Sequence, residues 1–384
     1  MLELVKGTPI NCLVGESRPP IPLDGLEFIA LKAGAPPPGV ALREGIWPGV
    51  KGAQRGGDSA DAGPTGGPWV DSNAGVIRLA RAQAPEAEVW LTYPAPAASE
   101  VVPMEFFPLP VIEAECYGAH WVISLHPSLA EGLRQRSDAA LAAWKRMMAA
   151  LKLAASHPEW RRWEPVAALA VVSDFEGENE FLGGEFLNLA PRRHLAYRIV
   201  REEEVQETSF AGQQAILYIN AAPPADAIRE KLLAFASDGG LLITPAGLMN
   251  GEPAATKQGF NLYNWGKGKV ASPQEEWYDP YILVADVHML ISHRLDVVRL
   301  WNASVMNSHY TAAPDGKRAV VQLLSYGGSR RNEELVSLRV AAAHGKARMF
   351  TLDGPAEVEL VRHAGGTEAR LPPFRTYAAV EFEA

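Results

Sequence analysis

The chain has 384 residues, of which 47% are hydrophobic and 21% charged, a composition typical of a folded globular protein. A chain of this length usually folds into more than one domain, each with its own hydrophobic core, so we expect two or three domains. The formal net charge of -9 argues against a nucleic-acid partner, because a phosphate backbone requires a basic surface.

No stretch approaches the ~18 consecutive apolar residues that span a membrane, so we expect no membrane partner. The amino-terminal residues lack the basic start and the cleavage site of a signal peptide. We therefore expect a cytoplasmic protein, or a secreted or periplasmic one if the natural precursor is longer. Cys12 and Cys116 are too few for a disulfide framework and are expected to be buried free thiols.

Residues 1–165 alternate short apolar runs with amphipathic stretches, which indicates strands and helices of a parallel sheet. The predicted strands are residues 10–14, 26–31, 40–42, 89–92 and 121–125, and the predicted helices are residues 71–84, 104–117 and 138–156. Five or six strands fall short of the eight of a complete barrel, so we expect a partial or degenerate (β/α) barrel.

Residues 166–295 predict a doubly wound α/β domain with a flavodoxin-like sheet. Residues 166–172 are an unbroken apolar run, which indicates a strand buried on both faces. An acidic loop, a helix up to Pro191 and a second strand at residues 195–200 complete a βαβ unit. Further strands are expected at residues 215–219 and 241–244, with helices at residues 225–236 and 280–293. The stretch 250–269 is polar and predicts irregular structure.

Residues 296–384 lose the helical pattern and show seven short apolar runs separated by turn signals such as Pro314-Asp315-Gly316. This spacing predicts a carboxyl-terminal antiparallel β-sandwich.

Several stretches resemble proteins related to glycoside hydrolases, and the order of the parts is similar to the family 42 β-galactosidase architecture. These stretches are REGIWPGV (43–50), GPTGGPWVDSN (63–73), YGAHWVISL (117–125), VSDFEGENEFLGGEFLNL (172–189) and LWNASVMNSHY (300–310). The resemblance implies a barrel-like part, a trimerisation domain like a class I glutamine amidotransferase, and a terminal β-sandwich. It also implies a carbohydrate ligand and a homo-oligomer, either a dimer or a trimer.

Amidotransferase activity is not expected. Such enzymes use a cysteine nucleophile activated by a histidine. Residues 166–295 contain no cysteine, so this domain is interpreted as a scaffold or an oligomerisation element.

Two carboxylates facing each other are the requirement for hydrolysis of a glycosidic bond. Glu44 is the first candidate, because it follows a predicted strand, where barrel enzymes place catalytic groups. Arg43 could hold its carboxylate ionised, and Trp47 could stack on a sugar ring. Asp71 is the candidate partner, with a helix N-cap as its alternative role; Glu176 is the other candidate partner.

The remaining expected sugar contacts flank the same strand ends and the acidic loop. Residues 49–67 form a long Gly-rich loop, which is interpreted either as a binding loop or as flexible padding. The acidic loop has three open interpretations: a solvated turn, a cation site, or a carbohydrate contact. The predicted sugar-binding residues besides Arg43 and Trp47 are Trp69, Asn73, Tyr93, His126, Asp174, Glu176 and Asn179.

The sequence thus favours a glycoside-hydrolase-like protein that acts on carbohydrate through paired carboxylates, without a cofactor or a metal. The alternative is a non-catalytic carbohydrate-binding or oligomeric scaffold, because the barrel-like part is shorter than a complete hydrolase barrel.

Overall fold

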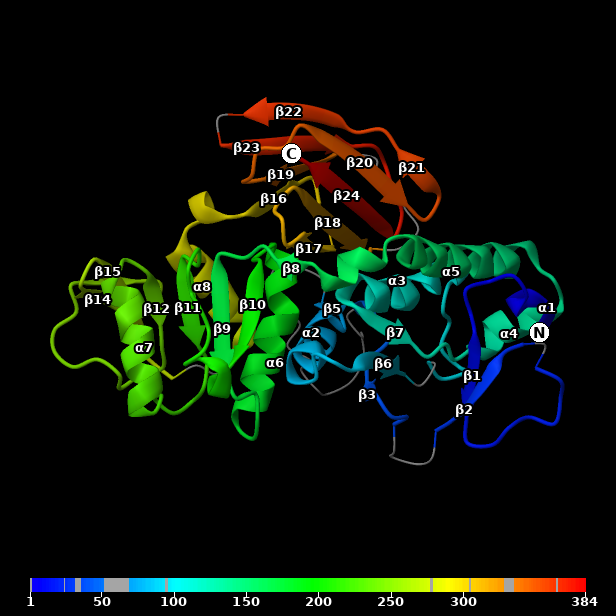
Figure 1. The fold of residues 1–384 in the computed structure, drawn as a ribbon, viewed down its shortest axis with the longest axis horizontal. Helices are drawn as coiled ribbons and strands as arrows, with labels where there is room; N and C mark the ends of the chain where they lie inside the picture. The colour runs from blue at the N-terminus through cyan, green and yellow to red at the C-terminus, as the bar shows by residue number, and fades with distance from the viewer. Residues whose placement is uncertain are drawn as a thin grey trace.

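The computed structural model describes residues 2–23, 25–31, 36–51, 69–93, 96–276, 279–303, 305–327, 335–363 and 365–384. The chain is a mixed α/β protein with several separate sheets. Figure 1 shows the first part (blue to cyan) and the second part (green to yellow) side by side, with the strands of the last part (yellow to red) above the place where the two meet. None of the described helices is long and apolar enough to cross a membrane.

The first part contains small sheets and no closed barrel among its described residues. Two pairs stand apart from the main sheet of this part: β1 (Cys12–Gly15) lies parallel to β2 (Glu27–Ala30), and β4 (Gly49–Lys51) lies antiparallel to β5 (Trp69–Asp71). The main sheet has the order β3 (Val40–Glu44), β6 (Glu88–Thr92), β7 (Ala119–Trp121), and all its pairs are parallel. The helices are α1 (Leu2–Val5), α2 (Ala74–Gln83), α3 (Pro108–Tyr117), α4 (Pro127–Arg134) and α5 (Asp138–Ser156).

The helix predicted over residues 71–84 begins later than predicted, at Ala74. Asp71 ends β5, and α2 begins at Ala74 with Asn73 in the N-cap position. The Asn73 side chain makes no capping bond, because its amide is held by Ile46 and Glu113 instead. Asp71 is therefore a strand-end residue and not a cap.

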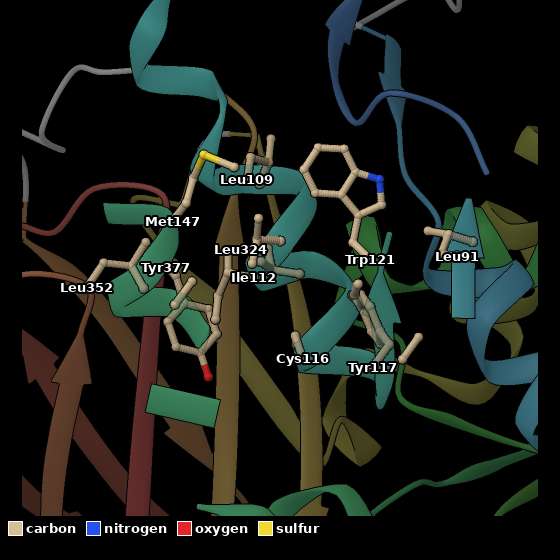
Figure 2. Packing of buried hydrophobic residues seen from close by; sticks show 14 of the residues in the cluster. Leu91, Leu109, Ile112, Cys116, Tyr117, Trp121, Met147, Leu324, Leu352 and Tyr377 are labelled. Atoms are coloured by element: carbon tan, nitrogen blue, oxygen red, sulfur yellow. The ribbon is translucent and has the colours of Figure 1, made fainter. Parts of the chain in front are cut away.

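Helix α3 has no exposed face. All ten of its residues are buried, because α2, α5 and β7 of the first part and β18 of the sandwich pack around it. In Figure 2, Ile112 and Leu109 of α3 lie between Trp121 on one side and Leu324 and Tyr377 on the other. The first part and the sandwich therefore share one hydrophobic core.

The second part has a seven-stranded sheet with helices on both faces. Strands β10 (Tyr197–Arg201), β9 (Leu169–Ser173), β11 (Ala215–Tyr218), β12 (Leu241–Ile243) and β15 (Gly268–Pro273) are parallel. Every residue of β9 is buried, as its unbroken apolar run predicts. Leu169 and Val171 face α6 (Asn179–Leu189) and α8 (Pro280–Ile291), whereas Ala170 and Val172 face α7 (Asp226–Ser237).

The prediction of irregular structure over residues 250–269 is wrong. This stretch forms β13 (Ala255–Lys257) and β14 (Phe260–Trp265), which extend the sheet in antiparallel order beyond β15. Polar side chains hide these strands from a pattern search, because β13 is exposed along its whole length.

The last part consists of two antiparallel sheets, as expected. One has the order β16 (Val298–Trp301), β19 (Val336–Val340), β23 (Gly366–Leu371), β22 (Glu359–His363). The other has the order β21 (Gly354–Ala356), β20 (Lys346–Thr351), β24 (Tyr377–Glu383), β18 (Arg318–Ser325), β17 (Met306–Ala312), β8 (Glu164–Pro165). Strands β21 and β23 were not among the predicted strands.

Candidate functional site

The candidate site lies where β3, β5 and β6 end. Glu44, the last residue of β3, pairs with Thr92 of β6, and Asp71, the last residue of β5, pairs with Gly49. We call this region the β3–β5–β6 edge; it comprises Glu44, Asp71, Asn73 and Tyr93.

Asn73 ties the two chain segments of this edge together. Its Oδ1 accepts a hydrogen bond from the Ile46 amide at 2.8 Å, and its Nδ2 donates to the Ile46 carbonyl at 2.9 Å. The chain that follows Glu44 is thereby held beside the chain that follows Asp71. Asn73 itself is 1% exposed, so it acts on the edge by positioning Ile46.

The predicted catalytic residues differ in exposure. Glu44 is exposed, whereas Asp71 is 7% exposed. Burial, together with the negative charges of Glu100 and Asp71, raises the pKa of Tyr93 to about 12. The Tyr93 hydroxyl therefore stays protonated at neutral pH and is available as a hydrogen-bond donor within the field of Asp71.

The two residues expected to support Glu44 have other contacts. The Arg43 guanidinium donates to the Leu42 carbonyl at 3.0 Å and to Gln83 Oε1 at 3.3 Å. The Trp47 ring packs within an aromatic cluster, with centroids 5.3 Å from Tyr93, 5.6 Å from Phe107 and 5.7 Å from Trp121. Trp47 therefore anchors the segment after Glu44 in the core.

Two of the predicted contacts fall partly or wholly outside the described residues. Trp69 belongs to β5, but its side chain is not among those described. Residues 52–68, the main part of the predicted binding loop, also lie outside the described ranges.

His126 has a structural role that its position after an apolar run does not reveal. It occupies the N-cap of α4, where Nδ1 accepts from the Ser128 amide at 3.2 Å. Its other ring nitrogen lies 3.3 Å from the Ala97 carbonyl oxygen. The ring is 1% exposed, so His126 stabilises the turn that leads into α4.

The acidic loop closes the end of β9 with its own hydrogen bonds. Asp174 Oδ1 accepts from the Glu176 amide and from Asn179 Nδ2, both at 3.0 Å. Asn179 Oδ1 accepts from the Ala221 amide at 2.8 Å, which links this loop to the loop after β11. The Asp174 and Asn179 side chains are thus engaged within the protein, and Glu176 is exposed.

Glu113 is a buried carboxylate beside the β3–β5–β6 edge. It accepts hydrogen bonds from Ser72 Oγ at 2.8 Å, Asn73 Nδ2 at 2.7 Å and Tyr326 Oη at 2.6 Å. Burial raises the pKa of Glu113, and these hydrogen bonds act in the opposite direction. The sequence signal was the pair Glu113 and Glu115 within an otherwise apolar helix, PLPVIEAECY, since acidic groups in such a helix indicate buried carboxyl groups with dedicated partners.

Glu185 of α6 is a further carboxyl group near the edge, and sequence reasoning did not select it. Burial raises the pKa of Glu185, and the negative charge of Asp71 raises it further. Helices α2 and α6 approach closely here: a Cβ added to Gly75 would lie 3.1 Å from the Gly184 carbonyl oxygen. Asp71 and Glu185 lie far apart in the chain, and no sequence pattern indicates that they are close in space.

Solved structures with a similar fold are glycoside hydrolases. An α-L-fucosidase isoenzyme 2 from Paenibacillus thiaminolyticus matches with a TM-score of 0.51 and 10% identity, covering 77% of this chain and 60% of the fucosidase. A rhamnosidase from Novosphingobium sp. PP1Y matches with a TM-score of 0.50 and 14% identity, covering 90% of this chain and 34% of the rhamnosidase. The GH42 β-galactosidase Gan42B from G. stearothermophilus gives a TM-score of 0.46 and 12% identity, with 74% and 51% of the two chains covered.

No protein-family model matches the sequence, and no curated protein matches it. The chain spans less than two thirds of the length of these fucosidase and rhamnosidase chains. The fucosidase and rhamnosidase structures confirm the predicted resemblance to glycoside hydrolases at the level of the fold. This chain has a glycoside-hydrolase-like fold, with several sheets and without a closed barrel among its described residues.

Proposed function

We propose that this protein acts on carbohydrate at the β3–β5–β6 edge, with Glu44 and Asp71 as paired carboxylates. The observation that carries the proposal is the double hydrogen bond between Asn73 and Ile46. It holds the segment after Glu44 against the segment after Asp71, as a two-carboxylate mechanism requires. The glycoside-hydrolase-like fold supports the same substrate class.

The division of roles follows from the environments of the carboxyl groups. Glu44 is exposed and therefore open to a substrate or a water molecule, which suits the nucleophile or the base. A general acid needs a raised pKa, and Glu185 has one because of burial and the charge of Asp71. We therefore include Glu185 with Glu44 and Asp71 as a group that contributes to proton transfer. Tyr93 and Trp47 shape the same edge.

The chain is proposed to comprise three units: residues 1–165, a partial barrel; residues 166–295, a glutamine-amidotransferase-like unit; and residues 296–384, the sandwich. The strand order β10-β9-β11-β12-β15 supports the second unit. Residues 166–295 contain no cysteine, so this unit serves as a scaffold and, in our proposal, assembles subunits. Light scattering on the purified chain tests the assembly: a dimer or a trimer supports it, and a monomer contradicts it.

Hydrolysis of a panel of aryl glycosides tests the catalytic proposal. Wild type should turn over at least one member, and Glu44→Gln and Asp71→Asn should each lower kcat by about 100-fold or more, as loss of an acid or base group does. Glu86→Gln is the matched control, because Glu86 is an exposed carboxylate beside the opposite end of β6. An unchanged kcat in Glu44→Gln and Asp71→Asn would contradict the assignment of these two carboxyl groups as catalytic.

A second candidate function is carbohydrate binding without turnover. The observation that favours it is the open three-stranded sheet β3-β6-β7, which stands where a hydrolase barrel would have eight strands. A glycan array that shows binding, combined with an absence of turnover on the glycoside panel, would select this function over hydrolysis.

A further inference from the structure

A cluster of two histidines and one aspartate lies at the junction between the second part of the chain and the sandwich. His288 is in the last turn of α8, and His293 and Asp296 follow in the turn that leads to β16. One ring nitrogen from each histidine and one carboxylate oxygen all lie within 4.8 Å of one another. Of the described residues, this is the group whose positions permit joint metal coordination.

Both imidazole rings direct a nitrogen at the same carboxylate. His288 Nε2 lies 2.7 Å from Asp296 Oδ1, and His293 Nδ1 lies 3.2 Å from Asp296 Oδ2. The two ring centroids are 4.0 Å apart. Two ring nitrogens and one carboxylate oxygen thus converge on one small volume, as the ligands of a metal ion do.

We propose that His288, His293 and Asp296 form a Zn²⁺ site. Two imidazole nitrogens and one carboxylate oxygen are a donor set that Zn²⁺ accepts in proteins, with a water as the fourth ligand. Zinc bonds of about 2.0 to 2.1 Å place tetrahedral ligands about 3.4 Å apart. The observed group needs only side-chain adjustments to reach this spacing, since its widest separation is within 4.8 Å.

The surroundings of the three residues support a ligand role. The Arg299 Nε donates to Asp296 Oδ2 at 3.2 Å, which leaves Oδ1 for the metal and orients the carboxylate, as outer-shell groups do in zinc sites.

Exposure gives the ion both an entry path and a protected position. The His288 and Asp296 side chains are 5% and 7% exposed, whereas the His293 side chain is 52% exposed. An ion would enter past His293 and rest against the two buried ligands. Because His288 belongs to α8 and Arg299 to β16, the bound ion would fasten the second part of the chain to the sandwich.

A second cluster in the same chain supplies a matched comparison. Glu115 pairs with His120 at 3.0 Å and with Arg161, which repeats the carboxylate, histidine and arginine arrangement with one histidine fewer. One histidine and one carboxylate do not chelate a Zn²⁺ ion as three ligands do. His120 is also partly exposed, with 40% of its side chain accessible, so its replacement is a fair control for His293.

Calorimetric titration of the chelator-treated full-length protein with Zn²⁺ tests the proposal. Wild type should bind one ion per chain, and His293→Ala should lose this binding, whereas His120→Ala should keep it. His293 is exposed, so the variant should fold, and circular dichroism checks this. Zinc should also raise the unfolding temperature of wild type and of His120→Ala but not of His293→Ala.

Cobalt substitution supplies a readout that does not depend on any activity. Co²⁺ in a tetrahedral site gives strong visible absorption, which should appear in wild type and be absent in His293→Ala. Wild type that binds neither ion, or a His293→Ala variant that binds as well as wild type, would overturn the proposal and leave the cluster as an ion-pair network.

Discussion

Glu113 is a fully buried carboxylate that joins two parts of the chain. Its partners Ser72 and Asn73 belong to the first part, and its partner Tyr326 follows β18 of the sandwich. Asn307 Nδ2 also donates to Tyr326 Oη at 3.2 Å. Removal of one partner of such a buried carboxyl group costs more than an ordinary hydrogen bond contributes, because the group left behind has no water to replace that partner.

Replacement of Tyr326 by phenylalanine should therefore destabilise the fold. The change removes the donor to Glu113 and leaves a buried carboxylate with fewer partners, which costs about 1 to 3 kcal/mol in the free energy of unfolding. Tyr117→Phe is the control, because the buried Tyr117 hydroxyl has no hydrogen-bond partner among the described residues, and its removal should be neutral or stabilising. Equal losses in the two variants in urea denaturation would contradict this account.

His309 should make stability fall in mild acid. Burial, reinforced by the positive charges of Arg78 and Arg81, lowers the pKa of His309 well below its ordinary value. As pH falls below about 6.5, the unfolded chain gains a proton that the folded chain does not bind, so the free energy of unfolding decreases.

Glutamine takes up no proton in either state, so the variant His309→Gln removes the contribution of this side chain to the pH dependence of stability. Between about pH 7 and pH 5 its free energy of unfolding should fall less steeply than that of wild type, by up to about 1.4 kcal/mol per pH unit. Urea denaturation at a series of pH values measures the slope. Parallel slopes in the two proteins would show that His309 takes up a proton in the folded state.

At this scale the sequence predicted residue positions better than residue roles. Glu44 does end a strand, as its apolar neighbours indicated. The partners of Asn73 and Glu113 could not be predicted, because Tyr326 and Glu113 are separated by 213 positions. The candidate pairing of Glu44 with Asp71 stays a prediction until the variants are measured.

Helices α2 and α6 meet across two glycines, and these differ in the space around them. A Cβ on Gly75 would lie 3.0 Å from the Asn188 amide nitrogen and 3.1 Å from the Gly184 carbonyl oxygen. A Cβ on Gly184 would have no described atom within 4 Å. Gly75 therefore permits the close approach of the helices. Gly184 weakens α6 without a compensating contact.

Alanine at these two positions should have opposite effects. Gly75→Ala forces the helices apart and should destabilise the protein by about 1 to 3 kcal/mol. Gly184→Ala should stabilise it by about 0.5 to 1 kcal/mol, the difference in helix propensity. Thermal unfolding followed by circular dichroism compares them; a destabilising Gly184→Ala would show that α6 has no free space at that position.

Elements with strong apolar patterns were predictable, and those without were not. The expected helix over residues 138–156 agrees with α5, and the run at residues 166–172 contains most of β9. Strand β13 was missed because its exposed residues carry no apolar alternation. Strand β14 does bury Phe260 and Leu262 alternately, but this short signal lies between polar residues and glycines that favoured irregular structure. Their pairing depends on the neighbouring strand β15, which local sequence does not specify.

At the scale of the molecule, the first part and the sandwich form one packed body around α3. Leu324 and Tyr377 of the sandwich belong to the same hydrophobic cluster as Ile112 of α3. The sequence predicted the order of the three parts but not this shared core, because a helix that is apolar on every side does not reveal which elements cover it, and its two carboxyl groups do not name their partners. The β3–β5–β6 edge lies beside this shared core, because Val70 and Leu91 belong to it and Tyr93 packs against it.

Saccharide binding at the β3–β5–β6 edge can be measured directly. Calorimetric titration with the sugars selected on a glycan array should show binding to wild type and to the control Glu86→Gln. Glu44→Gln and Asp71→Asn should each weaken it by about tenfold or more, which is about 1.4 kcal/mol. If no saccharide binds wild type, or if both variants bind as tightly as wild type, carbohydrate is not handled at the β3–β5–β6 edge.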